Sequence, residues 1–280
     1  MKVRVLTGIG IFLVLLPILL LSAYIVYPIA LGILCLIACF ELLRVFGLNK
    51  NLFCAVPSYI ITLAMPIFAS DVFAFIDGER EYILIIALVL FAYLVYLAGL
   101  AVLSRGRISF KLASGVFTAV AYVSVSFTSL SLLRYIEGGA YHFALVFIVA
   151  WMCDTFAYFT GMLLGKHKLA PDISPKKTVE GSLGGVVFAI LGCVAYGLIV
   201  QYGFGLKVNY PVLLAIGFIG SVVAQIGDLF ASLIKREYGI KDYSRLLPGH
   251  GGIMDRFDSI LALSTPLMVI CLLAPPFCTV

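Results

Sequence analysis

Charged side chains are scarce in this sequence. Only 12% of its 280 residues are Asp, Glu, Lys or Arg, and 63% are hydrophobic. A typical soluble domain carries about 25% charged residues. So much apolar surface has no use in a soluble protein of this length, whereas a bundle of lipid-facing helices requires it. The scarcity of charge therefore excludes an ordinary soluble domain and predicts a membrane protein.

The signatures of redox, metal-thiolate and nucleic-acid-binding proteins are also absent. The seven cysteines lie in or beside apolar runs without the spacing of a four-ligand metal site, and their odd number argues against a disulfide framework. No basic run interleaved with aromatic residues appears, so the net charge of +5 indicates no nucleic-acid partner. Without an internal repeat or low-complexity tail, residues 1–280 are expected to form a single integral-membrane domain.

Long apolar runs account for most of the chain. The first is uncharged from Val5 to Phe40, and as one helix it would be about 54 Å long, beyond a hydrocarbon core of about 30 Å. We interpret it as two spans broken near Pro28. Cleavage of the first as a signal peptide is disfavoured, because its run is long and leads directly into the second. The runs together predict an all-α polytopic bundle of about nine spans, at 5–22, 24–40, 52–70, 82–103, 112–133, 143–164, 183–200, 210–234 and 258–277.

The basic residues are unevenly divided between the loops. With the N-terminus inside, one face collects sixteen of the nineteen Lys and Arg residues, while the other keeps Arg80, Arg134 and Lys207 beside an acidic loop with Asp71, Asp77, Glu79 and Glu81. This asymmetry predicts a cytoplasmic N-terminus and supports the number of spans. The two longest loops, about 165–182 and 235–257, fall on the cytoplasmic face.

Two aspartates lie inside predicted spans, where a charge costs about 2.5–3.5 kcal/mol on insertion scales. Each belongs to a polar stripe on one helix face. The stripes are Asp154, Tyr158, Gly161 and Gly165, and Gln225, Asp228, Ser232 and Lys235. A buried ion pair or an interhelical hydrogen bond would explain one aspartate, but two stripes that end beside the two polar loops favour a functional site. The Gly161–Gly165 spacing is explained equally well by helix packing.

Three glycines crowd one turn of the second polar loop. Gly249, Gly251 and Gly252 would leave backbone amides free to face phosphate oxygens. The adjacent His250 is a candidate base or ligand, although a loop histidine that hydrogen-bonds to the backbone is equally compatible.

Three carboxylates flank this turn. Asp255 and Asp258 share one face of the next helix's first turn, and Asp228 lies on the preceding helix. Capping of the helix would account for one of the pair. Three carboxylates beside many basic residues suit oxygen-ligated Mg²⁺ and a polyphosphate.

The first polar loop places Lys176 and Lys177 between Ser174 and Thr178. Two lysines flanked by hydroxyls have the composition of a phosphate site. Lysines beside a span are also common topology signals or contacts to anionic lipid, and the loop alone does not decide between these roles.

The last third of the chain resembles a known signature. The segment Gln225–Ser259, QIGDLFASLIKREYGIKDYSRLLPGHGGIMDRFDS, is similar to the motif of phosphatidate cytidylyltransferases (CDP-diacylglycerol synthases). Matching positions are Ser232, Lys235, Arg236, Lys241, Asp242, Pro248, His250, Gly251, Gly252, Asp255, Arg256 and Asp258. DTFAYFTG, GKHKLAP and SPKKTVEG, between Asp154 and Gly181, resemble the family's second block, and FELLRV at Phe40–Val45 resembles an inner-loop element. Met162 departs from the pattern, because these enzymes often carry a basic residue there.

The resemblance implies a homodimeric membrane enzyme with a polar cavity open to the cytoplasm and to lipid. It implies a metal centre at Asp228, Asp255 and Asp258, with basic residues that address the nucleotide. On this basis the chain would transfer CMP from CTP to phosphatidic acid, with one or two Mg²⁺ ions, in a bacterial inner membrane. We assign catalysis to Asp228, Asp255 and Lys235. Substrate contacts are assigned to Asp154, Tyr158, Ser174, Lys176, Lys177, Thr178, Ser232, Arg236, Lys241, His250, Gly251, Gly252 and Arg256.

Two rival functions remain to be compared with this one. The nearer is a CTP-dependent lipid kinase or a cytidylyltransferase for an ether-linked lipid. The more distant is a transporter whose aspartates bind coupling ions. For a transporter we would expect polar stripes toward both faces and an internal repeat. Here both stripes end beside the loops of one face, and no internal repeat is found.

Overall fold

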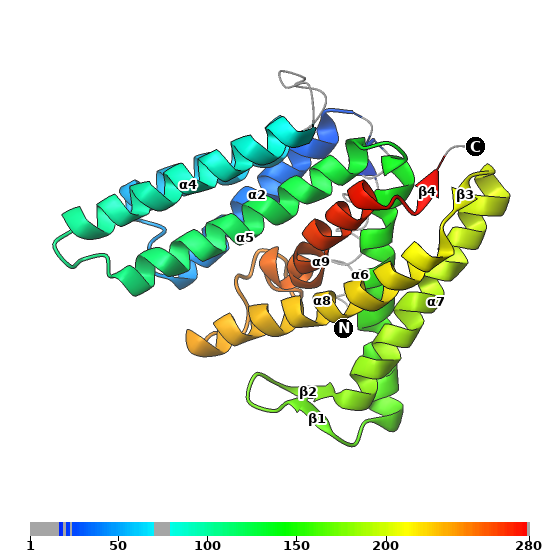
Figure 1. Cartoon of the computed structure of the whole chain (residues 1–280). Coiled ribbons are helices and arrows are strands. Elements are labelled where there is room, and N and C mark those ends of the chain that lie inside the picture. The colour runs from blue at the N-terminus through cyan, green and yellow to red at the C-terminus, as the bar shows by residue number, and fades with distance from the viewer. Residues whose placement is uncertain (1–16, 19–20, 23, 70–78, 279–280) are drawn as a thin grey trace. The chain divides into compact units, whose positions relative to one another are not determined.

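The computed structural model describes residues 17–18, 21–22, 24–69 and 79–278 (Figure 1). Eight helices lie within these residues: α2 (Val26–Val45), α3 (Leu52–Phe68), α4 (Glu79–Leu103), α5 (Phe110–Tyr135), α6 (Gly139–Leu164), α7 (Val179–Phe204), α8 (Tyr210–Glu237) and α9 (Met254–Leu273). Four short strands, β1 (Lys168–Ala170), β2 (Ser174–Thr178), β3 (Lys207–Val208) and β4 (Phe277–Cys278), form two antiparallel pairs.

Among the described helices, seven are long and apolar enough to cross a membrane, and α3 is shorter with 17 residues. The helical, polytopic character predicted from the apolar runs is thereby confirmed. Every predicted span from 24–40 onward overlaps one described helix. The predicted span 5–22 lies almost entirely outside the described residues, as do Asp71 and Asp77 of the predicted acidic loop.

Polar residues at helix starts explain where several helices begin. The Asn51 side chain accepts hydrogen bonds from the N–H groups of Phe53 and Cys54, and α3 follows directly. Asn209 caps α8 in the same way, with Pro211 in the first turn, where its missing N–H costs nothing. These caps satisfy N–H groups that a helix leaves without intrahelical partners.

The chain forms two compact units, each built from two segments: Met1–Leu132 with Asp242–Asp255, and Leu133–Lys241 with Arg256–Val280. In the first unit, α2 and α3 lie side by side. At Gly32 they approach so closely that an added Cβ would lie 2.7 Å from the Leu63 carbonyl oxygen. The Tyr27 hydroxyl donates to the Leu130 carbonyl at 3.2 Å, which ties α2 to α5 inside the core.

The second unit contains α6, α7, α8 and nearly all of α9. The region 165–182, which the sequence analysis treated as a loop, is largely the β1–β2 hairpin, and it projects beyond the start of α7 (Figure 1). Its register shift between Lys168 and Ala170 and its paired backbone give it a defined shape. At the other end of α7, β3 pairs with β4, with Val208 opposite Phe277. Strand β2 of the hairpin lies against α6 and α7, and its Lys177 contacts Asp228 of α8.

All seven cysteines are free, and six of them are buried, whereas Cys278 is exposed. This agrees with the absence of a predicted disulfide framework, and the buried Cys35 and Cys39 of α2 act as packing residues.

Candidate active site

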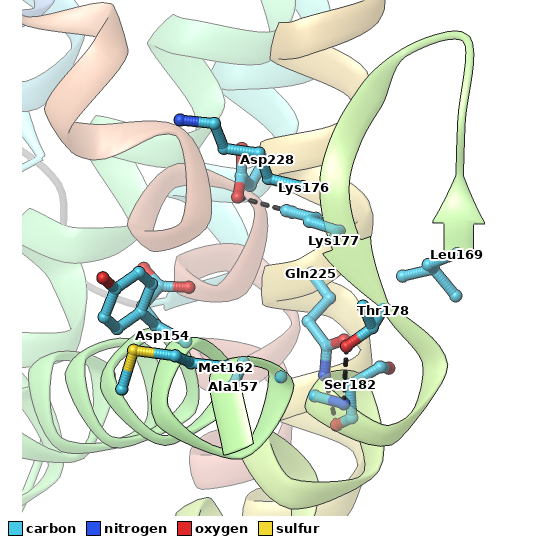
Figure 2. Close-up of a pocket in the computed structure, with 13 residues that line it drawn as sticks. Asp154, Ala157, Met162, Leu169, Lys176, Lys177, Thr178, Ser182, Gln225 and Asp228 are labelled. Atoms are coloured by element: carbon cyan, nitrogen blue, oxygen red, sulfur yellow. Dashed lines mark hydrogen bonds and ion pairs between the residues drawn. The ribbon is translucent and has the colours of Figure 1, made fainter. Parts of the chain in front are cut away.

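A cavity of about 300 Å³ lies in the second unit (Figure 2). It is lined by side chains from α6, the hairpin, α7 and α8: Asp154, Ala157, Tyr158, Gly161, Met162, Leu169, Lys176, Lys177, Thr178, Gly181, Ser182, Gln225 and Asp228. The cavity thus brings together part of each predicted aspartate stripe and the predicted Lys-Lys element, while Gly165, Ser232 and Lys235 do not line it. Three further lining residues, Ala157, Leu169 and Ser182, were not predicted to belong to the site.

The closest charged contact of the cavity joins the hairpin to α8. Lys177 Nζ lies 2.5 Å from Asp228 Oδ2, and both side chains are about one-quarter exposed, at 25% and 27%. Ser232, one helical turn further along α8, donates its hydroxyl to Asp228 Oδ1 at 3.5 Å. One of the dashed lines in Figure 2 marks the Lys177–Asp228 pair. A cation is therefore already held at the carboxylate that the sequence predicted to be functional.

A second carboxylate lies on the α6 side of the cavity. Asp154 Oδ2 accepts a hydrogen bond from the Ser259 hydroxyl of α9 at 3.3 Å. Asp154 and Asp258 each experience electrostatic repulsion from Asp228. Asp154, Asp228 and Asp258 of the second unit therefore repel one another electrostatically. Of these three, Asp228 and Asp258 were predicted to be metal ligands, and Asp154 belongs to the first predicted stripe.

Basic residues offset this negative charge. Lys177 and Arg256 both attract Asp154, and Lys235 attracts Asp258. Lys176 lines the same cavity and is exposed. The site therefore combines carboxylates with basic side chains, which is the composition that binds a polyphosphate together with a divalent cation.

Thr178 lies at the junction of β2 and α7, where it caps the helix. Its Oγ1 accepts a hydrogen bond from Gly181 N–H at 3.1 Å, and its side chain is buried. An added Cβ at Gly161 would lie 2.9 Å from the same oxygen. The Gly161–Gly165 stripe therefore provides close packing of α6 against the cap of α7. The hydroxyl proton of Thr178 is still available to a ligand.

The hairpin is held by side chains on either side of it. Glu180 of α7 accepts from Lys166 N–H at 3.0 Å, and its Oε1 lies 2.6 Å from His167 Nδ1. From the end of α8, Arg236 Nε donates to the Ile173 carbonyl at 3.1 Å. In this structure Arg236 supports the hairpin, and its predicted role as a nucleotide contact stays a prediction.

The glycine turn belongs to the first unit, and its backbone differs from the expectation. The N–H groups of His250 and Gly251 donate to the Leu247 carbonyl at 2.8 and 3.0 Å, and Gly252 N–H donates to Asp255 Oδ2 at 3.0 Å. The prediction that these amides are free to face phosphate is therefore wrong for residues 250–252. The left-handed φ values of Gly249 and Gly251, 77° and 85°, show what the glycines do instead: they permit the tight turn.

Two buried side chains in this loop remain notable. His250 Nδ1 is buried and has no hydrogen-bond partner among the described residues, so a ligand there would satisfy it. Asp255 is buried and also accepts from Tyr243 N–H at 2.8 Å. One oxygen of Asp255 is thus engaged by two backbone donors, which is a bracing role that the sequence did not indicate.

The other predicted residues have defined positions. Ser174 begins β2, Lys241 follows α8, and neither lines the cavity. Among the described residues, no group of three or more His, Cys, Asp or Glu side chains is arranged to hold a metal ion. The carboxylates of Asp154, Asp228 and Asp258 are nevertheless hard oxygen donors of the kind that Mg²⁺ prefers, and Asp228 already accepts an ammonium group. The donor chemistry therefore fits the cation.

Comparisons with known proteins cover nearly the whole chain. Residues 2–274 match the sequence model of the cytidylyltransferase family. A phosphatidate cytidylyltransferase from Staphylococcus epidermidis is 39% identical over 262 residues, which covers 93% of this chain and 95% of the relative. Those from Staphylococcus aureus and Staphylococcus saprophyticus are 38% and 37% identical over 261 and 264 residues, with the same coverage.

Proposed function

The chain belongs to the cytidylyltransferase family, and on that premise we propose that it is a phosphatidate cytidylyltransferase. It would transfer CMP from CTP to phosphatidic acid, giving CDP-diacylglycerol and pyrophosphate. The observation that supports this most directly is the cavity in which Lys176, Lys177 and Thr178 face Asp154 and Asp228. The resemblance found in the motifs is confirmed by the match over residues 2–274.

The reaction requires positioning and charge neutralisation more than covalent help from the protein. An oxygen of phosphatidate attacks the α-phosphorus of CTP, and pyrophosphate leaves on the opposite side. The phosphate of phosphatidate is already ionised near neutral pH, so no strong base is needed. CTP carries about four negative charges. Lys176 and Lys177 would bind its phosphates, and the Thr178 hydroxyl would donate a hydrogen bond to them.

Lys177 has a double role in this proposal. In the absence of substrate it neutralises Asp228, whose partial burial would otherwise leave an uncompensated charge. When a triphosphate enters, the ammonium group can turn to it, because Lys is a flexible point charge. Asp228 then becomes available to a cation.

Mg²⁺ would be held by carboxylates, with Asp228 and Asp258 of the second unit as ligands. In the first unit, one oxygen of Asp255 accepts two backbone N–H groups, and its role as a third ligand stays a prediction from the sequence. When bound, Mg²⁺ would supply positive charge at the developing phosphate oxygens. Lys235 and Arg256, which attract Asp258 and Asp154, would offset part of the negative charge of these carboxylates. Ser232 would orient Asp228 through their hydrogen bond.

We also propose the finer topology. Nine spans would place the N-terminus and the cavity on the cytoplasmic side of a bacterial inner membrane, where CTP is made, and the active enzyme would be a homodimer. The support is the charge asymmetry of sixteen to three among the Lys and Arg residues.

The decisive experiment uses the detergent-purified full chain. With labelled CTP, phosphatidate and Mg²⁺, pyrophosphate release and a labelled CDP-lipid should appear together, and both should be absent without phosphatidate. A panel of CTP, dCTP and ATP would define the nucleotide. Formation of CDP and a phosphorylated lipid would instead show a lipid kinase, and the absence of any nucleotide turnover would contradict the enzyme assignment.

A further inference from the structure

Glu41 is a buried carboxylate near the C-terminal end of an apolar helix. It lies on α2, and its side chain is only 1% exposed. Burying a carboxylate costs several kcal/mol unless hydrogen bonds or charges compensate it. The compensation identifies what the residue does.

Among the described residues, the hydrogen-bond donors to Glu41 come from the loop that carries the glycine turn, more than 200 residues away in sequence. The Ser244 hydroxyl donates to Oε1 at 2.6 Å. Ile253 N–H donates to Oε1 at 3.0 Å, and Met254 N–H donates to Oε2 at 2.9 Å. Glu41 and these donors belong to the same unit. A single carboxylate therefore binds both ends of the segment 244–254.

The contact has the chemistry of a helix cap. Helix α9 begins at Met254, so the N–H groups of Ile253 and Met254 have no intrahelical acceptor. Asp255 takes the preceding N–H, that of Gly252, by reaching back three residues as in a capping box. The residue directly before the helix is Ile253, whose apolar side chain cannot supply the cap from within the chain. Here Glu41 of α2 supplies it from a distant helix.

Gly252 is required for this arrangement. A Cβ added to it would collide with both oxygens of Glu41. One turn further along α2, Arg44 Nη2 donates to the Tyr243 carbonyl at 2.5 Å, and Tyr243 is fully buried. Two side chains spaced i, i+3 on α2 therefore hold the loop at Tyr243, Ser244 and the start of α9.

We propose that Glu41 is a positioning residue for the reaction, because it presets the turn Pro248–Gly252 and the His250 ring before substrate binds. The proposal rests on the proposed function for its catalytic consequence. Since the N–H groups of residues 250–254 all have acceptors within the unit, the turn acts through its shape and through His250. Glu41 itself touches no substrate.

The test compares Glu41→Gln with Glu137→Gln, the same change at an exposed loop residue. Glutamine keeps the size of the side chain but offers one acceptor oxygen where three donors need two. A displacement of about 1 Å in a positioned group costs on the order of a hundredfold in rate. We therefore expect Glu41→Gln to lower kcat by about that factor with little change in the KM for CTP. Glu137→Gln should behave as the unmodified protein.

A readout that is independent of activity is limited trypsin digestion in detergent. The exposed Lys241 precedes the clamped segment, and the exposed Arg245 lies near its start. Glu41→Gln should increase cleavage there while the melting temperature of the protein stays within a few degrees. Unchanged turnover with an unchanged cleavage pattern would overturn the proposal, and so would a general loss of thermal stability without selective cleavage.

A second variant covers the case in which Glu41→Gln does not fold. Ser244→Ala removes one of the three donors, and it should raise loop cleavage and lower kcat several-fold. Normal cleavage and turnover in that variant would contradict the proposal. If the unmodified protein did not turn over CTP and phosphatidate, the proposed function would fail, while the digestion pattern would still decide whether Glu41 holds the loop.

Discussion

Lys177 Nζ and Asp228 Oδ2 lie 2.5 Å apart and connect strand β2 to helix α8. Lys177 belongs to the first polar loop and Asp228 to the polar stripe of α8, and both side chains line the cavity (Figure 2). A partly buried ion pair adds little net stability, because the cost of removing both charges from water offsets much of their attraction. We therefore expect the Lys177–Asp228 pair to matter more for activity than for the free energy of unfolding.

Replacing Lys177 by Ala should impair the enzyme without unfolding it. A hydrogen bond to a charged group is worth about 1.5–3 kcal/mol, so loss of the ammonium–phosphate contact should lower kcat/KM for CTP about 10- to 100-fold. Steady-state kinetics of the detergent-purified variant would measure this. Lys176→Ala should act in the same direction.

Lys168→Ala is the matched control, because Lys168 is exposed on β1 and does not line the cavity. Its kinetics should be normal. Equal damage from Lys168→Ala and Lys177→Ala would favour a diffuse electrostatic role, because surface charges act interchangeably and site residues do not.

Asp228→Asn should lower kcat by about two orders of magnitude or more, because it removes a hard anionic ligand and keeps the size of the side chain. Combining it with Asp258→Asn should cost little more, since residues that act as one unit are not additive. The dependence of the rate on Mg²⁺ concentration should weaken in the variants. Near-normal turnover with unchanged Mg²⁺ dependence would refute the metal assignment, and exposed Asp172→Asn controls for the chemistry of the substitution.

The topology can be tested with one introduced cysteine and one native cysteine. Among the native cysteines only Cys278 is exposed. Nine spans from a cytoplasmic N-terminus would place it outside the cell, so it should react with a membrane-impermeant thiol reagent added to intact cells. Ser174→Cys, made in a Cys278→Ser background, should react only after the reagent reaches the cytoplasm. Labelling of residue 174 from outside would overturn both the proposed orientation and the access of cytosolic CTP.

Helix positions were predictable from the sequence where apolar runs set them, and less so where distant contacts do. The prediction of 210–234 matches α8, Tyr210–Glu237, because an asparagine cap and a following polar loop bound the run. The prediction of 258–277 starts four residues later than α9, Met254–Leu273. The N-terminal turn is formed because Glu41 and Asp255 satisfy its amides, and Glu41 acts from 213 residues away. The helix ends before Pro275 and Pro276, as proline sterics require.

The cavity residues were found from charge inside spans, and the bracing residues were missed. Asp154 and Asp228 stand out because charge in an apolar segment needs a reason. Glu41 falls just after the predicted span 24–40, within the FELLRV element that resembles the family's inner loop, and no role was predicted for it. The antiparallel pairing of the hairpin was also missed, because Pro171-Asp172 and a lysine-rich strand do not show the apolar alternation by which strands are identified.

Gly181→Ala should destabilise the second unit and also impair activity. An added Cβ would lie 2.6 Å from the Ala157 carbonyl oxygen and 2.9 Å from Thr178 Oγ1, and neither the backbone of α6 nor the capping hydroxyl can move away freely. Overpacking of this kind costs about 1–3 kcal/mol. Displacement of Thr178 would also move the neighbouring Lys177 away from Asp228. The melting temperature in detergent should fall. When kcat/KM for CTP is measured well below that temperature, it should fall further than the loss of stability alone explains.

Gly99→Ala is the matched control, because Gly99 lies in the interior of α4 with nothing within 4 Å of the added Cβ. It should leave activity unchanged and the melting temperature equal or slightly higher, because alanine favours a helix over glycine by about 1 kcal/mol. A Gly181→Ala protein that matched the Gly99→Ala protein in both measurements would show that the close approach of α6 to the start of α7 is not needed to form the site.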